Sequence, residues 1–394
     1  MRCRRMLYLS VLCLGVLGCA GDGDTPAAAS QDSTEQEDAG TADSGSMVGA
    51  RSNGIPPLHP YLSDSAWPTS HGSAYAQGAS ENKGPGHADG TVQFVQTGLV
   101  SITLTYGPET ASGESVIWGS QPGGVFKAIR TTDTLEVVSN GTSDGEVNSL
   151  IAGAYTVLDV DGVFYRTFEN RIEAWVDDPS DPRSEISKRN DWVLPDENSG
   201  AVIGLALTWD GTLVFATEAG QVGAIDRALA SYELIQLSAD EVVSNSIAVD
   251  EAGGIFVVTD KALYRAQWTG TLLSLDEADG AWRATYEAGD TERVSGRLGL
   301  GSGSTPSLMG GPDDPHRFVA ITDGQDLMHL ALFWRDDIPD DAPEPPLGKD
   351  PRLAAMVAVD FGDSEIEESV SEQSVLVSDY RAVVVSNLYK DQSG

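Results

Sequence analysis

The sequence predicts an all-β fold and, within that class, a β-propeller of four-stranded blades. Short runs of β-branched and aromatic residues recur along the chain, as at 213–217 and 255–259, and such residues fit a pleated, half-buried surface. Turn residues bound these runs, which are too short for typical helices. Two copies of one pattern start about 41 residues apart, at Gly204 and Asn245, and a propeller blade has a period of about 40 to 50 residues.

The repeated pattern consists of a strand, an Asp-Gly type of turn, a second strand, a short turn and a third strand. One copy occupies residues 201–226 and the other 245–268. Asp210-Gly211 and Gly253-Gly254 supply the positive φ that tight hairpin turns need. The continuously apolar runs indicate strands that are covered on both faces, as in radially stacked sheets.

The remaining segments repeat this unit in chain order. Residues 65–78 open the domain, and Trp67 and Tyr75 are expected to anchor that segment against an outer strand. The other predicted strands lie at 100–106, 114–118, 125–129, 154–160, 163–168, 171–175, 304–309, 318–322, 329–334, 373–378 and 382–387. Residues 178–190 are expected to be a polar excursion between blades, and 336–351 an acidic, proline-rich surface loop.

The number of blades stays open at six to seven, because about six units can be counted. A propeller has to close, since open blade edges invite aggregation. Either residues 93–106 complete the last blade, or the propeller is truncated at the C-terminus.

The first 18 residues are predicted to be a secretory signal peptide. Three arginines lie within the first five residues, and an apolar stretch at 6–16 follows, which is the usual order of such signals. Residues 16–19 (Val-Leu-Gly-Cys) resemble the lipobox of bacterial lipoproteins, in which the signal is cut before a cysteine that then carries acyl chains. The resemblance implies lipid attachment at Cys19; the alternative is an ordinary signal peptide with an incidental cysteine.

Residues 19–53 are predicted to be a disordered acidic tether, and 54–394 the propeller domain. The tether contains almost no large apolar residue, so burial cannot offset its ordering entropy. All three cysteines, Cys3, Cys13 and Cys19, lie in or next to the signal. Thiol catalysis, cysteine-ligated metals and a disulfide framework are therefore excluded for the propeller.

The formal net charge of −36 limits the partners that the protein can have. Nucleic acid and anionic membrane surfaces should repel it, so contact with a membrane is expected only through the N-terminal lipid. The predicted location is the bacterial cell envelope, either periplasmic or at the outer membrane and cell surface. A monomer is expected.

Several segments resemble uncharacterised bacterial secreted proteins of the quinoprotein-alcohol-dehydrogenase-like (PQQ-like) propeller superfamily. They are 245–260 (NSIAVDEAGGIFVVTD), 301–309 (GSGSTPSLM) and 318–323 (FVAITD), together with a Trp-Pro pair at 67–68. Active quinone enzymes of that superfamily use adjacent cysteines, regularly placed tryptophans and a calcium site. This chain lacks the cysteine pair and the regular tryptophans, so no pyrroloquinoline quinone (PQQ) or other cofactor is predicted.

A second, local likeness concerns a metal site. The stretch 245–250 (NSIAVD) resembles a strand motif of gluconolactonase-like propellers, in which an Asn helps to hold a divalent metal. That likeness implies Asn245 as a Ca²⁺ ligand, with Asp260 or Asp323 as partners, since oxygen donors suit calcium. The alternative is that all three are ordinary turn residues.

The expected function is that of a binding or interaction module, because no catalytic constellation can be assigned. The sequence contains no Gly-x-Ser-x-Gly nucleophile motif, and its five histidines form no metal-binding spacing. The partner would be an envelope protein, a glycan or a small ligand, with Asn245 and Asp323 near the mouth of the channel. The alternative function is a calcium-dependent lactonase-like hydrolase or a quinoprotein-like oxidoreductase that uses the channel.

Overall fold

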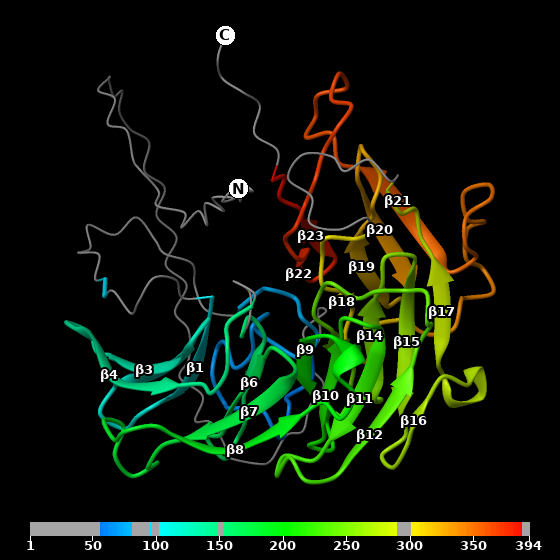
Figure 1. The fold of residues 1–394 in the computed structure, drawn as a ribbon. Coiled ribbons are helices and arrows are strands. Elements are labelled where there is room, and N and C mark those ends of the chain that lie inside the picture. Colours follow the sequence, from blue (N-terminus) through cyan, green and yellow to red (C-terminus); the bar gives the residue numbers. More distant parts are fainter. Residues whose placement is uncertain (1–55, 81–93, 96–101, 149–152, 290–300, 388–394) are drawn as a thin grey trace, which may run out of the picture. The chain divides into compact units, whose positions relative to one another are not determined.

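Six antiparallel sheets make up the part of the chain that the computed structural model describes, which is residues 56–80, 94–95, 102–148, 153–289 and 301–387. These residues belong to one compact unit, Gly49–Gly394, and the sheets follow one another in chain order (Figure 1). Sheets one to three consist of β1 (Thr103–Glu109), β2 (Ser115–Gln121), β3 (Gly124–Arg130) and β4 (Leu135–Thr142); β5 (Thr156–Leu158), β6 (Phe164–Phe168), β7 (Arg171–Val176) and β8 (Ser187–Val193); and β9 (Val202–Leu207), β10 (Leu213–Thr217), β11 (Gln221–Ile225) and β12 (Tyr232–Gln236). Sheets four to six consist of β13 (Ala248–Val249), β14 (Gly254–Val258), β15 (Ala262–Trp268), β16 (Leu273–Ser274) and β17 (Trp282–Thr285); β18 (Ser307–Met309), β19 (Phe318–Thr322), β20 (His329–Trp334) and β21 (Leu353–Ala358); and β22 (Leu376–Ser378) and β23 (Arg381–Val383).

The first five sheets pair their strands in sequence order, as a propeller blade does, apart from β17 of sheet four. In sheet four, β15 pairs with both β16 and β17, while sheet six contains two described strands. The only helical elements among the described residues are two short 3-10 turns, Glu197–Ser199 and Glu277–Asp279. The predicted all-β propeller fold is therefore confirmed.

One extended segment, residues 56–80, touches the first strand of every sheet, and we call it the axial segment. Most of these contacts are hydrogen bonds in which a strand amide donates to a carbonyl of the segment. They are Tyr106 N to Trp67 O (β1), Leu158 N to Pro68 O (β5), Val249 N to Ala74 O (β13), Leu308 N to Tyr75 O (β18) and Val377 N to Gln77 O (β22), and in β9 Leu207 O accepts from His59 Nε2. The expectation that Trp67 and Tyr75 lie against an outer strand was wrong, because the segment pairs with first strands instead.

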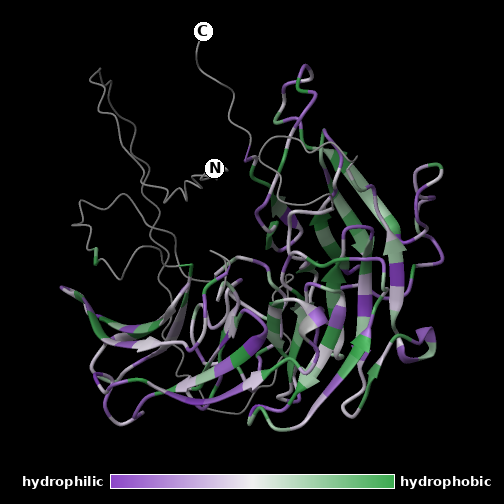
Figure 2. Ribbon diagram, in the orientation of Figure 1, coloured by the Kyte–Doolittle hydropathy of each residue, from purple (hydrophilic) through white to green (hydrophobic). Residues whose placement is uncertain are grey.

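Apolar side chains fill the spaces between neighbouring sheets. One cluster joins sheets two and three around Phe215, another joins sheets three and four around Val257, and a third joins sheets four and five around Phe333. The hydrophobic residues of strands such as β14, β19 and β20 contrast with hydrophilic turns and with the outer strand β8 (Figure 2). Burial of both faces explains the continuously apolar runs in the sequence.

Polar contacts tie the first turn of one sheet to the third strand of the next. Arg227, just after β11, pairs with Asp159 in the β5–β6 turn at 2.9 Å. Trp268, at the end of β15, donates its indole N–H to Asp210 in the β9–β10 turn at 2.7 Å. These Asp residues also accept amides of their own turns, so one residue type shapes the turn and joins two blades.

The fourth strands depart most from the sequence-based expectation. Outer strands β4, β8 and β12 were not predicted, and the expected polar excursion at 178–190 ends inside β8. Strand β8 (Ser-Lys-Arg-Asn-Asp-Trp-Val) is largely exposed, so it lacks the apolar run that marks the inner strands. No helix in the described part of the chain is long and apolar enough to cross a membrane.

Candidate functional site

A cavity of about 850 Å³ lies beside the axial segment and is the candidate functional site. Its volume falls within the range of roughly 300 to 1,000 Å³ that is typical of small-molecule sites. Outside the axial segment, two blade turns contribute Val160 and Trp209, and the end of β22 with the turn after it contributes residues 377–379. The cavity therefore lies at the end of the propeller where the first strands finish.

Trp209 forms the aromatic part of the wall. It follows β9, and the turn continues through Gly211, whose φ of +88° and close approach to the Tyr61 ring exclude a larger residue. The Trp209 ring lies 4.3 Å from the His59 ring and 6.0 Å from that of Tyr75. Trp209 also packs against three of the inter-sheet cores, so its position is fixed by the scaffold.

His59 is held in one neutral tautomer. Its Nε2 donates to Leu207 O at 2.9 Å, while its Nδ1 accepts from the amides of Tyr61 and Leu62. Burial lowers the pKa of His59 to about 4, although the bond to Leu207 acts in the opposite direction. Both ring nitrogens are committed to the backbone, so His59 shapes the cavity and has no free nitrogen for acid-base chemistry.

The electrostatics of the cavity favour neutral or cationic ligands. Its described lining contains the carboxylates Asp64 and Asp379 and no Lys or Arg. Proline and aliphatic side chains, such as the exposed Leu58, supply the apolar surface. A ligand with an apolar body and a positively charged or hydrogen-bonding end would match this lining.

The residues predicted for ligand or metal binding lie elsewhere. Asn245 lies before the start of β13, whereas the β13–β14 turn lies at the other end of that strand. Its side-chain amide donates to Ser302 O at 2.7 Å. Asp260, after β14, accepts from the amide of Val242 at 3.0 Å.

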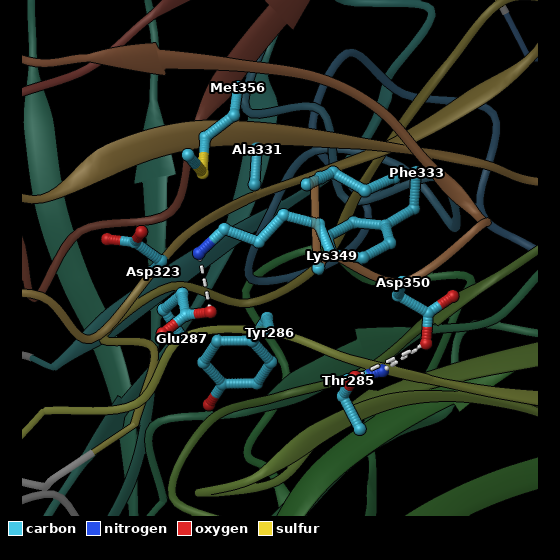
Figure 3. A pocket seen from close by; sticks show the side chains of 11 residues that line it. Thr285, Tyr286, Glu287, Asp323, Ala331, Phe333, Lys349, Asp350 and Met356 are labelled. Carbon is cyan, nitrogen blue, oxygen red and sulfur yellow. Dashed lines mark hydrogen bonds and ion pairs between the residues drawn. The ribbon is translucent and has the colours of Figure 1, made fainter. Parts of the chain in front are cut away.

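Asp323 lies in the wall of a second cavity of only about 40 Å³ (Figure 3). Its carboxylate accepts from His329 N and lies 2.8 Å from His329 Nδ1. Burial raises the pKa of Asp323, against these hydrogen bonds. Lys349 crosses the same space to Glu287 at 2.5 Å. The volume suffices for a few water molecules and is well below the range typical of small-molecule sites.

The metal ligands implied by the lactonase-like motif are an amide, Asn245, and the carboxylates Asp260 and Asp323. Among the described residues, no group of three or more His, Cys, Asp or Glu side chains is placed to hold a metal ion. Asn245, Asp260 and Asp323 instead make separate hydrogen bonds. Cys19, the predicted lipid attachment site, lies outside the described residues.

The chain is similar to an uncharacterised protein of the archaeon Archaeoglobus fulgidus, with 40% identity over 339 residues. These residues are 84% of this chain and 64% of the relative, so the chain spans less than two thirds of the relative's length. No protein-family model matches the chain. An archaeal relative does not confirm the predicted likeness to bacterial lipoproteins.

A more distant likeness is to the selenomethionine-substituted crystal structure of virginiamycin B lyase from Staphylococcus aureus. It has 13% sequence identity and a TM-score of 0.36, and covers 60% of this chain and 70% of that one. A likeness this distant carries no statement about function. The candidate site therefore has to be judged on its own geometry.

Sequence reasoning missed every residue that we now place in the larger cavity. His59 was considered only as one of the five histidines, and Trp209 only as part of the repeat unit at 201–226. A usable signal was present, since a tryptophan directly before an Asp-Gly turn is too large for an ordinary solvated turn. The Pro-Pro-Leu-His-Pro run at 56–60 also indicates a rigid, extended segment.

Proposed function

We propose that this protein is a binding module that takes a neutral or cationic ligand in the 850 Å³ cavity beside the axial segment. The observation that carries the proposal is the cavity itself, with a fixed aromatic wall at Trp209 and the carboxylates of Asp64 and Asp379. A small organic ligand or the end of a peptide would fit its volume.

The same geometry leaves no imidazole free for catalysis in the described lining of this cavity. His59 is the one imidazole in the described lining, and backbone groups occupy both of its nitrogens. General acid-base catalysis needs a group that can exchange a proton with the substrate. The two Asp carboxylates would then serve to attract and orient a ligand.

A steric block in the cavity tests this function. Leu58→Arg places a long cation at a lining position whose side chain is 72% exposed, so the fold should tolerate it. We expect it to abolish saturation-transfer NMR signals from a panel of small aromatic amines and neutral aromatic alcohols. Leu272→Arg, at a 60% exposed position outside the cavity, is the matched control and should bind normally. Absence of signal with the unmodified chain, or equal signals from both variants, would refute the proposal.

The same proposal places the module in the cell envelope, held by lipid on Cys19. The support is the signal-like N-terminus, with its basic residues, apolar stretch and cysteine in the order expected of a lipoprotein. Two or more acyl chains would anchor the domain stably. Expression in a bacterium with labelled palmitate should label the chain, and Cys19→Ser should remove the label and release the protein from membranes. Unlabelled wild-type protein in the soluble fraction would contradict the anchor.

Membership of the quinoprotein-like propeller superfamily completes the proposal. It is supported by the Trp-Pro segment and the blade motifs at 245–260 and 318–323. The propeller architecture agrees with it, while fold alone implies no activity. Native mass spectrometry of the full chain with added Ca²⁺ and quinone addresses the enzymatic alternatives, because one tightly held ion or quinone would favour an enzyme.

A further inference from the structure

An acceptor motif for N-linked glycans lies on β4, the outer strand of sheet one (Figure 1). Residues 140–142 read Asn-Gly-Thr. An asparagine two residues before Ser or Thr, with any residue except Pro between them, is the acceptor sequence for N-glycosylation. No other asparagine in the sequence meets this rule. The motif is short, so its placement in the fold decides whether it can carry a glycan.

The alternation of side chains along β4 separates the middle residue of the motif from the other two. Gly141 faces sheet two, because a Cβ atom at this position would clash with the Trp175 ring on β7. Ser139 has the same orientation, since it is buried and accepts a backbone N–H from the segment before β8. Successive side chains of a strand point to opposite faces, and the pairing with β3 is regular here. Asn140 and Thr142 therefore lie together on the face away from sheet two.

Both residues of the acceptor pair are exposed. Asn140 pairs with Phe126 on β3, and the Phe126 ring is turned towards the inner strand β2, where it occupies the space that a side chain at Gly119 would need. The ring therefore covers β2 and leaves Asn140 open to solvent.

Asn140 differs from other exposed asparagines of the fold in its hydrogen bonding. The side-chain amides of Asn190 and Asn198 donate to Ala228 O and to the Asp196 carboxylate, at 2.9 and 2.8 Å. In the part of the chain that the structure describes, the Asn140 side chain makes no hydrogen bond or ion pair. Its amide can therefore carry a substituent without breaking a contact of the fold.

We propose that Asn140 is the attachment site of an N-linked glycan, which is added when the chain is exported. The inference rests on the export to the cell envelope proposed above. Nδ2 of Asn140 would lose one proton and form a bond to the anomeric carbon of an oligosaccharide. The bond from that carbon to the phosphate of a lipid carrier would break, and the lipid phosphate would leave. The co-reactant is therefore a lipid-linked oligosaccharide, and Thr142 completes the sequence that its transferase recognises.

The glycan would leave the candidate ligand site free. Among the described residues, none of sheet one lines the cavity at Trp209. A glycan is bulky and solubilising, and here it would stand on an outer strand. Exposed strands of this kind invite pairing with other chains, so the modification would also protect β4 from association.

Mass spectrometry of the full chain, purified from the envelope of the organism that encodes it, is the test. Trypsin releases Asn140 in the peptide 131–166, because no Lys or Arg lies between Arg130 and Arg166. We expect this peptide to exceed its unmodified mass by that of one oligosaccharide, with fragment ions that place the addition on Asn140. The mature N-terminus, read in the same experiment, shows whether the signal was removed.

Variants of the motif, made in the same organism, separate the acceptor from its context. Asn140→Gln and Thr142→Ala should lose the added mass completely, whereas Thr142→Ser should keep it, since Ser also satisfies the motif. Asn198→Gln changes an exposed asparagine outside the motif and is the matched control, which should keep the glycan. Thermal midpoints show that each variant is folded.

Three outcomes would overturn the inference. A chain whose signal is removed and whose peptide 131–166 is unmodified would make the motif incidental, while the proposed export would stand. A glycan retained in Thr142→Ala would show that the motif does not direct the modification. A chain that keeps its signal and carries no glycan would refute both the export and the attachment site.

Discussion

Two tyrosines of the axial segment, Tyr61 and Tyr75, meet the blades through the same kind of contact in different surroundings. An arginine that follows a third strand stacks on each ring at 5.0 Å, Arg227 on Tyr61 and Arg335 on Tyr75. Each arginine also lies near acids in the first turn of the preceding sheet. Arg227 is 26% exposed in its side chain and hydrogen-bonds to Asp159 and to a second Asp of that turn.

Arg335 occupies the corresponding place and is fully buried. None of its guanidinium nitrogens has a hydrogen-bond partner among the described residues. Burial acts to lower the pKa of Arg335, but the negative charges of Asp250, Glu251 and Asp336, together with the neighbouring Tyr75, raise it overall. The comparison shows that the same arginine–tyrosine contact is stabilised in two ways. Hydrogen bonds to carboxylates stabilise it where the arginine is partly exposed, and stacking with the negative charge of nearby acids stabilises it where the arginine is buried.

The largest effect is expected for Tyr75→Ala. This change empties a fully buried site and removes the ring beneath Arg335, so the free energy of unfolding should fall by about 4 kcal/mol. Tyr61→Ala, at a half-buried site, should cost about 1 to 2 kcal/mol. Urea denaturation of the full chain measures both losses. Equal losses would show that Tyr61 and Tyr75 contribute equally to the stability of the axial segment.

Removal of the two arginines is the next test. Arg335→Ala leaves the buried Asp250 less compensated and should cost about 3 kcal/mol, whereas Arg227→Ala should cost about 1 kcal/mol because its ion pair is partly solvated. The same denaturation experiment compares them. A smaller loss for Arg335→Ala than for Arg227→Ala would mean that the buried guanidinium stabilises little.

Acid pH should lower the free energy of unfolding through two histidines of the axial segment, His59 and His71. Burial lowers the pKa of His59 and of His71 to about 4, from an ordinary value of 6.5. Between these values the unfolded chain binds protons that the folded chain does not. Stability is therefore complete above pH 6.5 and falls towards pH 4, by about 2 kcal/mol per histidine at pH 5.

The measurement is the change in unfolding free energy between pH 7.5 and pH 5. His59→Gln and His71→Gln should each reduce that change by about 2 kcal/mol, whatever their effect at neutral pH. Burial raises the pKa of Asp159, Asp250 and Asp323, which acts in the opposite direction at lower pH. A wild-type slope retained in both variants would assign the acid sensitivity to other groups.

The smallest effect is expected for Asp161→Ala. Asp161 is 66% exposed and pairs with Arg227 at 2.7 Å, and such pairs contribute little, so less than about 0.5 kcal/mol should be lost. Asp159→Ala is the comparison, because that buried carboxylate accepts the amides of residues 161 and 163; its loss should cost about 2 kcal/mol. A large loss of unfolding free energy in Asp161→Ala would show that the contact between Arg227 and Tyr61 depends on the Asp161 ion pair.

The inner strands could be predicted from the sequence because burial on both faces requires unbroken apolar runs. Strands β10, β15, β19 and β20 lie where those runs predict them. The outer strands β8 and β12 could not be predicted, since one exposed face and polar side chains resemble a loop in composition. These outer strands form by pairing with the free edge of the preceding strand, and that edge exists only once the sheet has folded.

The candidate site was less predictable than the fold. The proposed ligand residues Asn245 and Asp323 were chosen for their polar type at strand ends, and hydrogen bonds to Ser302 and His329 engage them. His59 and Trp209 were missed, because their contact at 4.3 Å joins segments 150 residues apart.

The sequence by itself determined the all-β class, the repeated blade unit and its Asp-Gly turns, because local patterning and turn chemistry specify them. Only the tertiary structure decided that the axial segment pairs with the first strand of every sheet, since its own residues carry no strand pattern. Tertiary structure also decided which arginine is buried. Both Arg335 and Arg227 follow a third strand, but the packing of neighbouring blades buries Arg335 and leaves Arg227 partly exposed.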